Sequence, residues 1–510
     1  MIVLAAKDKR FLGVLFLVSF LIRSLVFHFY LCPDNKYWQV DSPTYHAIAQ
    51  GIASEKGISL PSGEPNFYRV PGYPLFVAFF YKVFGDNPLA ALWVQVVLAS
   101  CIPVLIFLLS RVLFPRRRWL AHIAGGCGAV HLGLVLYSGF FMTESLFIVL
   151  FLLFVLCFFS AVHLWFCDAK IQKGLVHECY CNPDMMAWLP DSAMSVPSFE
   201  PFHERVHSKQ SKKLCSVRAV EERSGLFLLS GLFLGMASLV RPVGHYLLGV
   251  ALLLVLFSRA SWRARLRGMI ALFIAWFFVV AFWLVRNYML LGHVFFHTLP
   301  GGHFMYLSAA RVAMYAHDCS YQQARDHLAA EVKTLMKERA EQNGKPLNEI
   351  EKCYVHETIA RRYFTGYPLL TVKTWLTDIT RTCLSLYSAE LLYVDSGRQT
   401  IDYFAKGRGL WSCFMRYIWP QTTNWFLKAV VWLEIALFFF VLLGLLLGFM
   451  FVLCSSVVPW HDACSWWRCV PFMALFIVIA LAGGYARMRL PIEPFLLILS
   501  LYFWTHYWEK

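Results

Sequence analysis

The chain has 510 residues, of which 59% are hydrophobic, 17% aromatic and only 15% charged. This composition excludes an ordinary soluble globular protein and predicts an all-α polytopic membrane protein. The formal charge of +15 does not indicate a nucleic-acid partner, because the cations gather in short loops between apolar segments, where they set membrane topology.

The first apolar segment, residues 11–31, follows Lys7, Lys9 and Arg10. It is long enough to cross a bilayer and has no clear cleavage site, so we interpret it as an uncleaved anchor rather than a signal peptide. If cytoplasmic cations set the orientation, the N-terminus lies inside. The loop at about 32–74 then lies on the outer face.

This first external loop contains both an acid and a base. A short helix is expected from Ser42, which could cap it, with Tyr45 on its apolar face. Asp41 stands directly before this helix, and Arg69 lies in the proline- and glycine-marked stretch 67–74. An alternative role for Asp41 is a charge partner of the helix N-terminus, worth up to about 1 kcal/mol.

Further spans are expected up to Arg286. They cover residues 88–114, 120–137, 145–166, 225–240, 246–257 and 268–285, with a tight outer turn at 139–144 that contains Glu144. The two short spans are separated by a break at 241–244 and could instead be re-entrant.

A polar insert at about 167–223 separates two of these spans, and we expect it to be a loosely ordered cytoplasmic loop. Its cysteines and histidines raise a zinc alternative, but the cysteine spacing is not that of a zinc finger. The residues concerned are His177, Cys179, Cys181, His203 and His207.

Residues 287–424 are polar enough for an external, mainly helical domain, with helices at 319–342 and 347–364 and Pro368 ending the second. Spans follow at 426–453, at 470–484 and from 491 to about 504, with Trp467 and Arg468 marking an inner end. The chain thus divides into 1–286, 287–424 and 425–510, with about ten spans. No internal repeat is evident, so the inverted repeats of many transporters are not supported.

Five arginines stand at outer ends of spans, against the cation pattern of the chain. A single such arginine usually reaches toward lipid headgroups, but five together favour binding of a phosphate. Three acids share this face, and Glu144 could simply favour the start of its helix. The histidines His46, His245 and His293 are expected to be interfacial polar residues rather than ligands. The five arginines are Arg69, Arg241, Arg286, Arg487 and Arg489, and the acids are Asp41, Glu144 and Glu493.

Several of these segments occur together, in the same order, in a known family. The chain resembles integral-membrane glycosyltransferases of the GT-C fold, specifically the bacterial relatives of protein O-mannosyltransferases and of the lipid A aminoarabinose transferase. The matching segments are Asp41-Ser-Pro-Thr-Tyr45, Arg69-Val-Pro-Gly-Tyr-Pro74, Thr143-Glu144-Ser145, Gly231 to Pro242 and Trp283 to Tyr288, with weaker matches at Gly301-Gly302 and Arg487-Met-Arg-Leu-Pro491. The long insert departs from the family pattern.

The resemblance implies that Asp41 is an essential acid and that Arg69 meets the phosphate of the donor. It further implies a sugar donor linked to a polyprenyl phosphate, presented from the outer leaflet. The protein would then be a multi-pass protein of the bacterial cytoplasmic (inner) membrane, with its site facing the periplasm. The acceptor would be a glycolipid such as lipid A, a glycan or a protein.

The residue types also fit this chemistry independently of the resemblance. Asp41 could act as general base on an acceptor hydroxyl or amine, and the five arginines could stabilise the departing phosphate. Glu144 could orient a substrate, with Tyr45 and Tyr68 in supporting positions. No metal or cofactor is required, although a divalent metal stays open. The alternatives are a transporter or flippase of an anionic lipid, and an envelope scaffold without catalysis.

Overall fold

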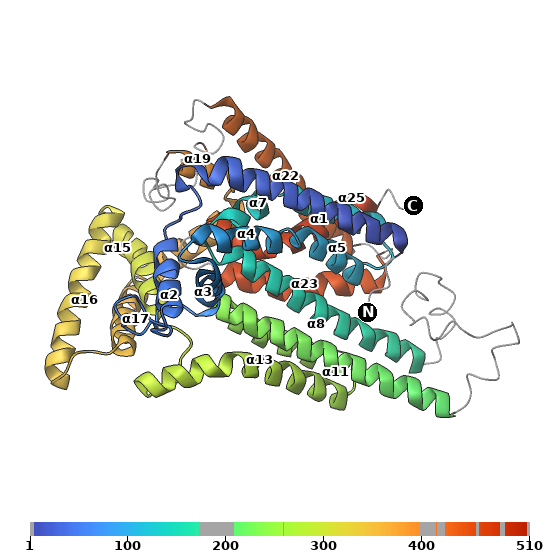
Figure 1. Ribbon diagram of the computed structural model, residues 1–510, viewed down its shortest axis with the longest axis horizontal. Coiled ribbons are helices and arrows are strands. Elements are labelled where there is room, and N and C mark those ends of the chain that lie inside the picture. Colours follow the sequence, from blue (N-terminus) through green and yellow to red (C-terminus); the bar gives the residue numbers. More distant parts are fainter. Residues whose placement is uncertain are drawn as a thin grey trace, which may run out of the picture.

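The computed structural model describes residues 5–172, 209–258, 260–396, 415, 424–454, 458–479 and 485–506. Within these residues the regular elements are helices, and the only β-type contact is an isolated bridge between Ser59 and Pro65. Figure 1 shows long helices lying roughly alongside one another, with a lobe of shorter helices, α15 to α17, at one end. The prediction of an all-α protein is therefore confirmed.

Five helical segments of the described residues are long and apolar enough to cross a membrane, and six if one bent pair counts as a span. Three further apolar helices are shorter, and the first of them, α3 (Gly72–Phe84), was not predicted as a helix. The length and composition of the described helices therefore do not give the predicted number of about ten spans. The five segments are Ala6–Leu31, Pro88–Leu113, Glu144–Val162, Trp262–Leu291 and Trp425–Cys454.

The N-terminal helices follow the predicted spans closely. The chain bends by 47° between α6 and α7, and a buried cation explains how this bend is tolerated. Arg23 of α1 is fully buried and donates to the carbonyls of Ala129 (3.2 Å) and Gly128 (3.5 Å), at the end of α6. Carbonyls at a helix end lack partners within the helix, so the guanidinium satisfies them. The helices are α1 (Ala6–Val26), α2 (Ser42–Ala53), α4 (Pro88–Ala99), α5 (Ile102–Leu113), α6 (Arg118–Val130) and α7 (Leu132–Gly139), with a π-helical turn η1 at Phe27–Leu31 and a 3-10 turn η2 at Pro33–Asn35.

The next helices form the long layer in which α11 packs against both α8 and α13 (Figure 1). Two expectations are corrected here. The last part of the insert, from Lys209, is helical and belongs to α11, and residues 173–208, which include His177, Cys179, Cys181, His203 and His207, lie outside the described residues. Helix α13 does not end at Arg286 but continues to Leu291, because the terminator is Gly292 in the left-handed conformation (φ 72°). The helices are α8 (Glu144–Gln172), α11 (Lys209–Val240), α12 (Val243–Leu256) and α13 (Trp262–Leu291).

The polar region after α13 has an apolar core of its own, which includes Met305, Leu328 and Ile359. Capping boxes at Ser320 and Asn348 start α16 and α17, in the regions where helices were expected. Pro368 does more than end a helix, because it is the first residue of α18, a position that suits proline. The elements are α14 (Leu299–His303), the π-helical η5 (Phe304–Ala309), α15 (Ala310–Ala316), α16 (Tyr321–Asn343), α17 (Glu349–Gly366), α18 (Pro368–Leu384) and α19 (Ser388–Ser396).

The C-terminal helices return to the bundle. Helix α23 begins ten residues earlier than predicted, so Trp467 and Arg468 lie within it instead of marking its inner end. The turn expected at 485–491 is short and helical, and it leads directly into α25. The elements are α22 (Trp425–Cys454), α23 (Trp460–Ile479), α24 (Ala486–Arg489), the 3-10 turn η6 (Leu490–Ile492) and α25 (Glu493–His506).

Candidate active site

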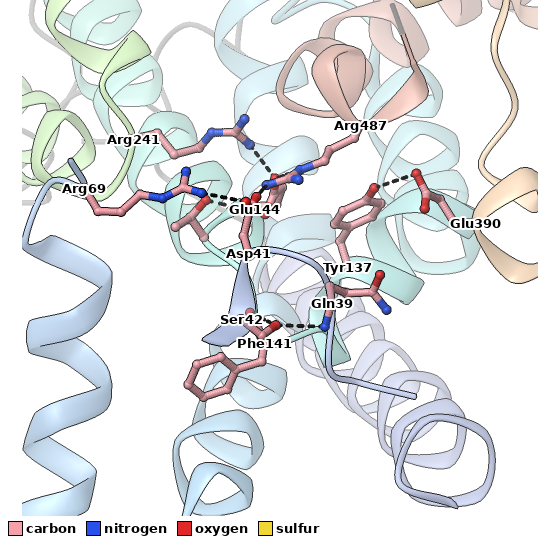
Figure 2. A network of polar contacts seen from close by, with 11 residues as sticks. Gln39, Asp41, Ser42, Arg69, Tyr137, Phe141, Glu144, Arg241, Glu390 and Arg487 are labelled. Atoms are coloured by element: carbon pink, nitrogen blue, oxygen red, sulfur yellow. Dashed lines mark hydrogen bonds and ion pairs between the residues drawn. The ribbon is translucent and has the colours of Figure 1, made fainter. Parts of the chain in front are cut away.

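The first half of the long loop places Asp41 directly before α2. Asp41 occupies the N-cap position, but its side chain makes no capping hydrogen bond. Ser42 does not cap the helix as expected. Its buried hydroxyl accepts from the amide of Gln39 (2.9 Å) and donates to the carbonyl of Phe141 (2.8 Å). These bonds tie the Asp41 segment to the turn that leads to Glu144, and Figure 2 shows them below the carboxylates.

The second half of the loop folds around Asn66. Its side chain accepts from the amide of Arg69 (3.2 Å) and donates to the carbonyl of the same residue (2.6 Å). A few residues later Gly72 starts α3 in close contact with the end of α11. A Cβ at Gly72 would lie 2.6 Å from the carbonyl carbon of Leu239, so only glycine permits this approach. The contact brings the Arg69 loop next to Arg241, which follows α11.

Two carboxylates and three guanidinium groups meet where these segments converge, and we call these five residues the charge cluster (Figure 2). Arg69 Nη2 donates to Asp41 Oδ1 at 2.6 Å, and Arg487 Nη2 donates to Asp41 Oδ2 at 2.9 Å. Arg487 also donates through Nε to Glu144 Oε1, the oxygen that accepts from Arg241 Nη1 at 2.9 Å. Arg487 thus bridges the two carboxylates, which lie in different loops.

The two carboxylates differ in their access to solvent. The side chain of Glu144 is fully buried, whereas that of Asp41 is 21% exposed. Burial alone would raise the pKa of the Asp41 carboxyl, but Arg487 and Arg69 outweigh it and hold this pKa below its ordinary value. Asp41 is therefore ionised at neutral pH and is the carboxylate that a substrate could reach.

Aromatic rings hold the guanidinium of Arg69 in place. Its Cζ lies 5.0 Å from the ring centroid of Tyr45 and 4.9 Å from that of Tyr68, distances at which a cation is attracted to the ring face. Tyr45 is buried, whereas Tyr68 is 44% exposed. Tyr45 thus supports the cation from inside, and Tyr68 stands at the open side.

Two of the five predicted arginines lie outside the charge cluster. Arg286 donates to the backbone carbonyls of Asn66 (2.9 Å) and Ile58 (2.8 Å), so it holds the first loop in shape. Arg489 donates to the buried carboxylate of Glu493 (2.6 Å) and to the carbonyl of Thr382 (2.9 Å). The structure thus brings three of the five arginines together, and phosphate binding by any of them stays a prediction.

Some polar groups around the charge cluster were not predicted as site residues, because no sequence motif marks them. Tyr137 is buried and donates to Glu390 Oε1 at 3.2 Å, close to Arg487 in Figure 2. His297 precedes α14 and His303 ends it. Burial, followed by the neighbouring His245 and His303, lowers the pKa of His297 to about 3, and burial, followed by Arg69, lowers the pKa of His303 to about 4. Both are therefore neutral at pH 7. Because both histidines are far from the first loop in the sequence, their proximity to the charge cluster could not be predicted.

The described residues contain no group of three or more His, Cys, Asp or Glu side chains that could hold a metal ion. Among the histidines expected at the interface, His46 lies 2.7 Å from the Tyr81 hydroxyl through Nδ1. His293 is exposed, whereas His245 is half-buried and packs on Phe296.

Comparison with known proteins gives a family match for one part of the chain. Residues 65–170 match the family model described as dolichyl-phosphate-mannose-protein mannosyltransferase, and this segment contains Arg69 and Glu144. The resemblance to this group of membrane glycosyltransferases is thus confirmed over that segment. A comparison with curated proteins gives no match.

Two solved structures illustrate the structural likeness. The archaeal oligosaccharyltransferase AglB from Archaeoglobus fulgidus, in complex with an inhibitory peptide and a dolichol-phosphate, shares 12% identity at a TM-score of 0.46, over 97% of this chain and 50% of that one. ArnT from Cupriavidus metallidurans, bound to undecaprenyl phosphate, shares 13% identity at a TM-score of 0.37, over 96% and 78%. This chain thus spans about half the length of AglB. Identities and TM-scores this low carry no function over to it.

Proposed function

We propose that this chain, which is related over residues 65–170 to the dolichyl-phosphate-mannose-protein mannosyltransferases, is a membrane glycosyltransferase. It would move a sugar from a polyprenyl-phosphate-linked donor to an acceptor in the cell envelope. The observation that carries the proposal is a partly exposed carboxylate, Asp41, held by the guanidinium groups of Arg69 and Arg487. A base and a phosphate-binding pair are the two parts that such a transfer needs.

In the proposed reaction Asp41 accepts a proton from the acceptor hydroxyl or amine as that group attacks the anomeric carbon. The bond from this carbon to the phosphate oxygen breaks on the opposite face, and its electron pair stays on the phosphate. The transfer therefore inverts the configuration at the sugar. Arg69 and Arg487 face the charge that develops on the leaving phosphate, and in a site largely closed to water such contacts are stronger than in bulk water.

The charge balance of the cluster supports an anionic ligand. Its three arginines and two carboxylates leave one positive charge in excess (3 − 2 = 1). A sugar ester of a polyprenyl monophosphate carries one negative charge. A phosphate bound by Arg69 and Arg487 would weaken the ion pairs of these arginines with Asp41, so the pKa of the Asp41 carboxyl would rise. Asp41 would then become a better base only when the donor is bound.

We assign a positioning role to Glu144 and Arg241 instead of direct contact with the sugar. Glu144 is fully buried, and it accepts from both Arg241 and Arg487 at the same oxygen. Glu144 would thus fix the direction in which Arg487 faces Asp41. Arg286 would keep the first loop closed, and Arg489 would anchor α24, so neither would bind the donor phosphate.

We further propose the GT-C arrangement with ten spans. Helices α11, α12, α23 and α25, added to the six spans that include the bent pair, would give this number, with the charge cluster at the outer face of a bacterial cytoplasmic membrane. A cysteine introduced at Asn343, the last residue of α16, should react with an impermeant thiol reagent from outside, and one at Ser211 should not. The opposite labelling pattern would reverse the orientation and place the cluster on the cytoplasmic side.

The proposal is tested by mass spectrometry of envelope glycolipids, glycans and glycoproteins from cells that carry the intact gene or Asp41→Asn. A sugar increment present only with the intact protein is the expected result, and its mass and carrier identify sugar and acceptor. The matched control is Glu64→Gln, which neutralises an exposed acid of the same loop and should leave the increment unchanged. Equal increments with Asp41→Asn, at equal membrane levels, would refute the proposal.

A transporter or flippase of an anionic lipid is the alternative that these arginines also allow. It is distinguished by reconstitution in vesicles. Movement of a labelled polyprenyl phosphate sugar across the bilayer, without cleavage of the sugar–phosphate bond, would favour the alternative.

A further inference from the structure

A second feature lies far from the charge cluster, near the opposite end of α8. A hollow of about 180 Å³ opens there between α8, the end of α12 and the start of α23. From Glu144 to Phe158 the helix rises by roughly 20 Å at about 1.5 Å per residue. With the charge cluster at one membrane face, as proposed above, this distance would put the hollow towards the other face. Its walls include Phe158, Phe159, Leu254, Phe257, Cys464 and Arg468.

The hollow combines an apolar wall with one guanidinium group. Phe158 and Phe159 are buried, whereas Phe257 is 80% exposed at the open side. Arg468 is half-buried and is the charged residue of the lining. An apolar recess with a cation at its wall matches a molecule that has a hydrocarbon chain and an anionic head.

More arginines gather beside the same wall. Arg265, in the first turn of α13, donates through Nη1 to the carbonyl of Leu256 at 2.5 Å, which fixes the start of α13 next to the end of α12. Arg263 and Arg267 of the same helix start are exposed. Asp462 is the acid at the start of α23, but it is buried and pairs with Arg117 at 3.5 Å. Among these described residues, the cations beside the hollow therefore outnumber the acids.

Exposed tryptophans indicate that this part of the chain lies at the level of lipid headgroups. Trp262, at the start of α13, is 56% exposed, and Trp467, next to Arg468, is 49% exposed. Tryptophan is enriched at membrane–water interfaces because its ring is apolar and its N–H is polar. We therefore expect the hollow to have hydrocarbon on one side and lipid phosphates on the other.

We propose that this hollow binds one anionic glycerophospholipid, with part of an acyl chain against Phe158 and Phe257 and the phosphate at Arg468. The arginines of α13 would favour an anionic lipid over a zwitterionic one, because each cation near a membrane surface attracts anionic headgroups. The lipid would join α8, α12 and α23 at a place where their side chains leave a gap. This proposal does not depend on the proposed glycosyl transfer, and its test measures no transfer.

The test uses the purified full-length chain after its lipids have been exchanged for detergent. Phosphatidylglycerol or phosphatidylcholine is then titrated into the micelles, while native mass spectrometry counts adducts and thermal unfolding reports stabilisation. A ligand that binds the native state raises the midpoint of unfolding. We expect one tightly retained phosphatidylglycerol. Equal retention of phosphatidylcholine would overturn the assignment to an anionic lipid.

Two variants and a matched control locate the site. Arg468→Ala removes the phosphate contact, for which we expect phosphatidylglycerol to bind about tenfold more weakly. Leu254→Trp fills the hollow and should abolish the adduct while Arg468 is still present. Arg10→Ala removes an exposed cation of α1, a helix that packs elsewhere in the bundle, and should change nothing. Unchanged binding in Arg468→Ala would overturn the proposal.

The intact protein provides an independent measurement in case a variant fails to fold. Phosphatidylglycerol with a photoreactive acyl chain should crosslink to peptides that contain Phe158 or Phe257. Crosslinks confined to other helices would refute the site. Formation of a disulfide between Cys464 and a cysteine of the insert, Cys179 or Cys181, would identify the insert as the occupant and would also overturn the proposal.

Discussion

Neutralising Glu144 should destabilise the folded protein much more than neutralising Asp41. The carboxylate of Glu144 is fully buried and accepts from two guanidinium groups at one oxygen. In Glu144→Gln, Arg241 loses its carboxylate partner and Arg487 keeps only Asp41. The charge cluster then carries three positive charges and one negative charge inside the protein.

The size of the effect follows from burial. Removing one partner of a buried ion pair costs about 3–5 kcal/mol, because the other charge stays behind without compensation. The side chains of Arg241 and Arg487 keep 15% exposure each, so we expect the lower end, about 3 kcal/mol. In Asp41→Asn, Arg487 keeps Glu144 and Arg69 keeps its two tyrosine rings, and the asparagine oxygen still accepts a hydrogen bond. The cost there should be about 1 kcal/mol.

The free energy of unfolding is measured by titrating the purified protein with SDS in mixed micelles, for both variants and for the control Glu64→Gln. We expect Glu144→Gln to unfold at clearly lower SDS than Asp41→Asn, and Glu64→Gln to match the wild type. The assignment of a positioning role to Glu144 would be refuted if Glu144→Gln were as stable as the wild type and yet inactive. Equal destabilisation by both variants would contradict the difference in burial on which the argument rests.

Three further predictions concern the loop, its tether and pH. Arg286→Ala frees the carbonyls of Asn66 and Ile58, so trypsin should cut after Lys56 sooner than in the wild type, and unchanged proteolysis would contradict the loop-closing role. Ser42→Ala leaves the Phe141 carbonyl without the hydrogen bond from this hydroxyl, at a cost of about 1–2 kcal/mol. Because Asp41 would then be misplaced, kcat for sugar transfer should fall up to about 100-fold, with little change in KM for the donor. An unchanged kcat would show that this tether is not important for transfer. His297 and His303 have pKa values lowered to about 3 and about 4, so between pH 6.5 and 4 the unfolded chain binds protons that the folded chain does not, and stability present above pH 6.5 is lost as pH falls. At pH 5 each histidine should cost about 1–2 kcal/mol at about 1.4 kcal/mol per pH unit, a loss that SDS titration at pH 7 and pH 5 would detect and that His303→Gln should roughly halve.

Local signals in the sequence predicted most of the helices. Apolar length indicated the membrane class and the main spans, and the Arg241-Pro242 break between α11 and α12 appears where proline was expected to interrupt a helix. These features depend on neighbours in the chain and on the lipid environment. The misplaced ends have the same origin. Arg286 looked like a span end because charge usually marks one, but the helix continued to the first residue that could reverse the chain, Gly292.

The presence of an acid and a base in the first loop was also readable from the sequence, because Asp41 and Arg69 are only 28 positions apart. The sequence did not show which other cations join these two residues. Arg487 lies 446 positions from Asp41, and nothing local distinguishes it from Arg489, two residues later, whose guanidinium pairs with Glu493 instead. Arg487 and Arg489 have different partners because α24 is helical, so their side chains point in different directions.

The sequence by itself thus determined the class of the protein, the positions of its breaks and a set of charged candidates, because hydropathy, proline and glycine act within a few residues. Only the tertiary structure decided which candidates share a site. That choice depends on contacts such as the approach of Gly72 to Leu239, which brings the first loop to Arg241, and on the depth at which each carboxylate is buried. Glu144 and Asp41 look alike in the sequence, and packing alone leaves one enclosed and the other open to a substrate.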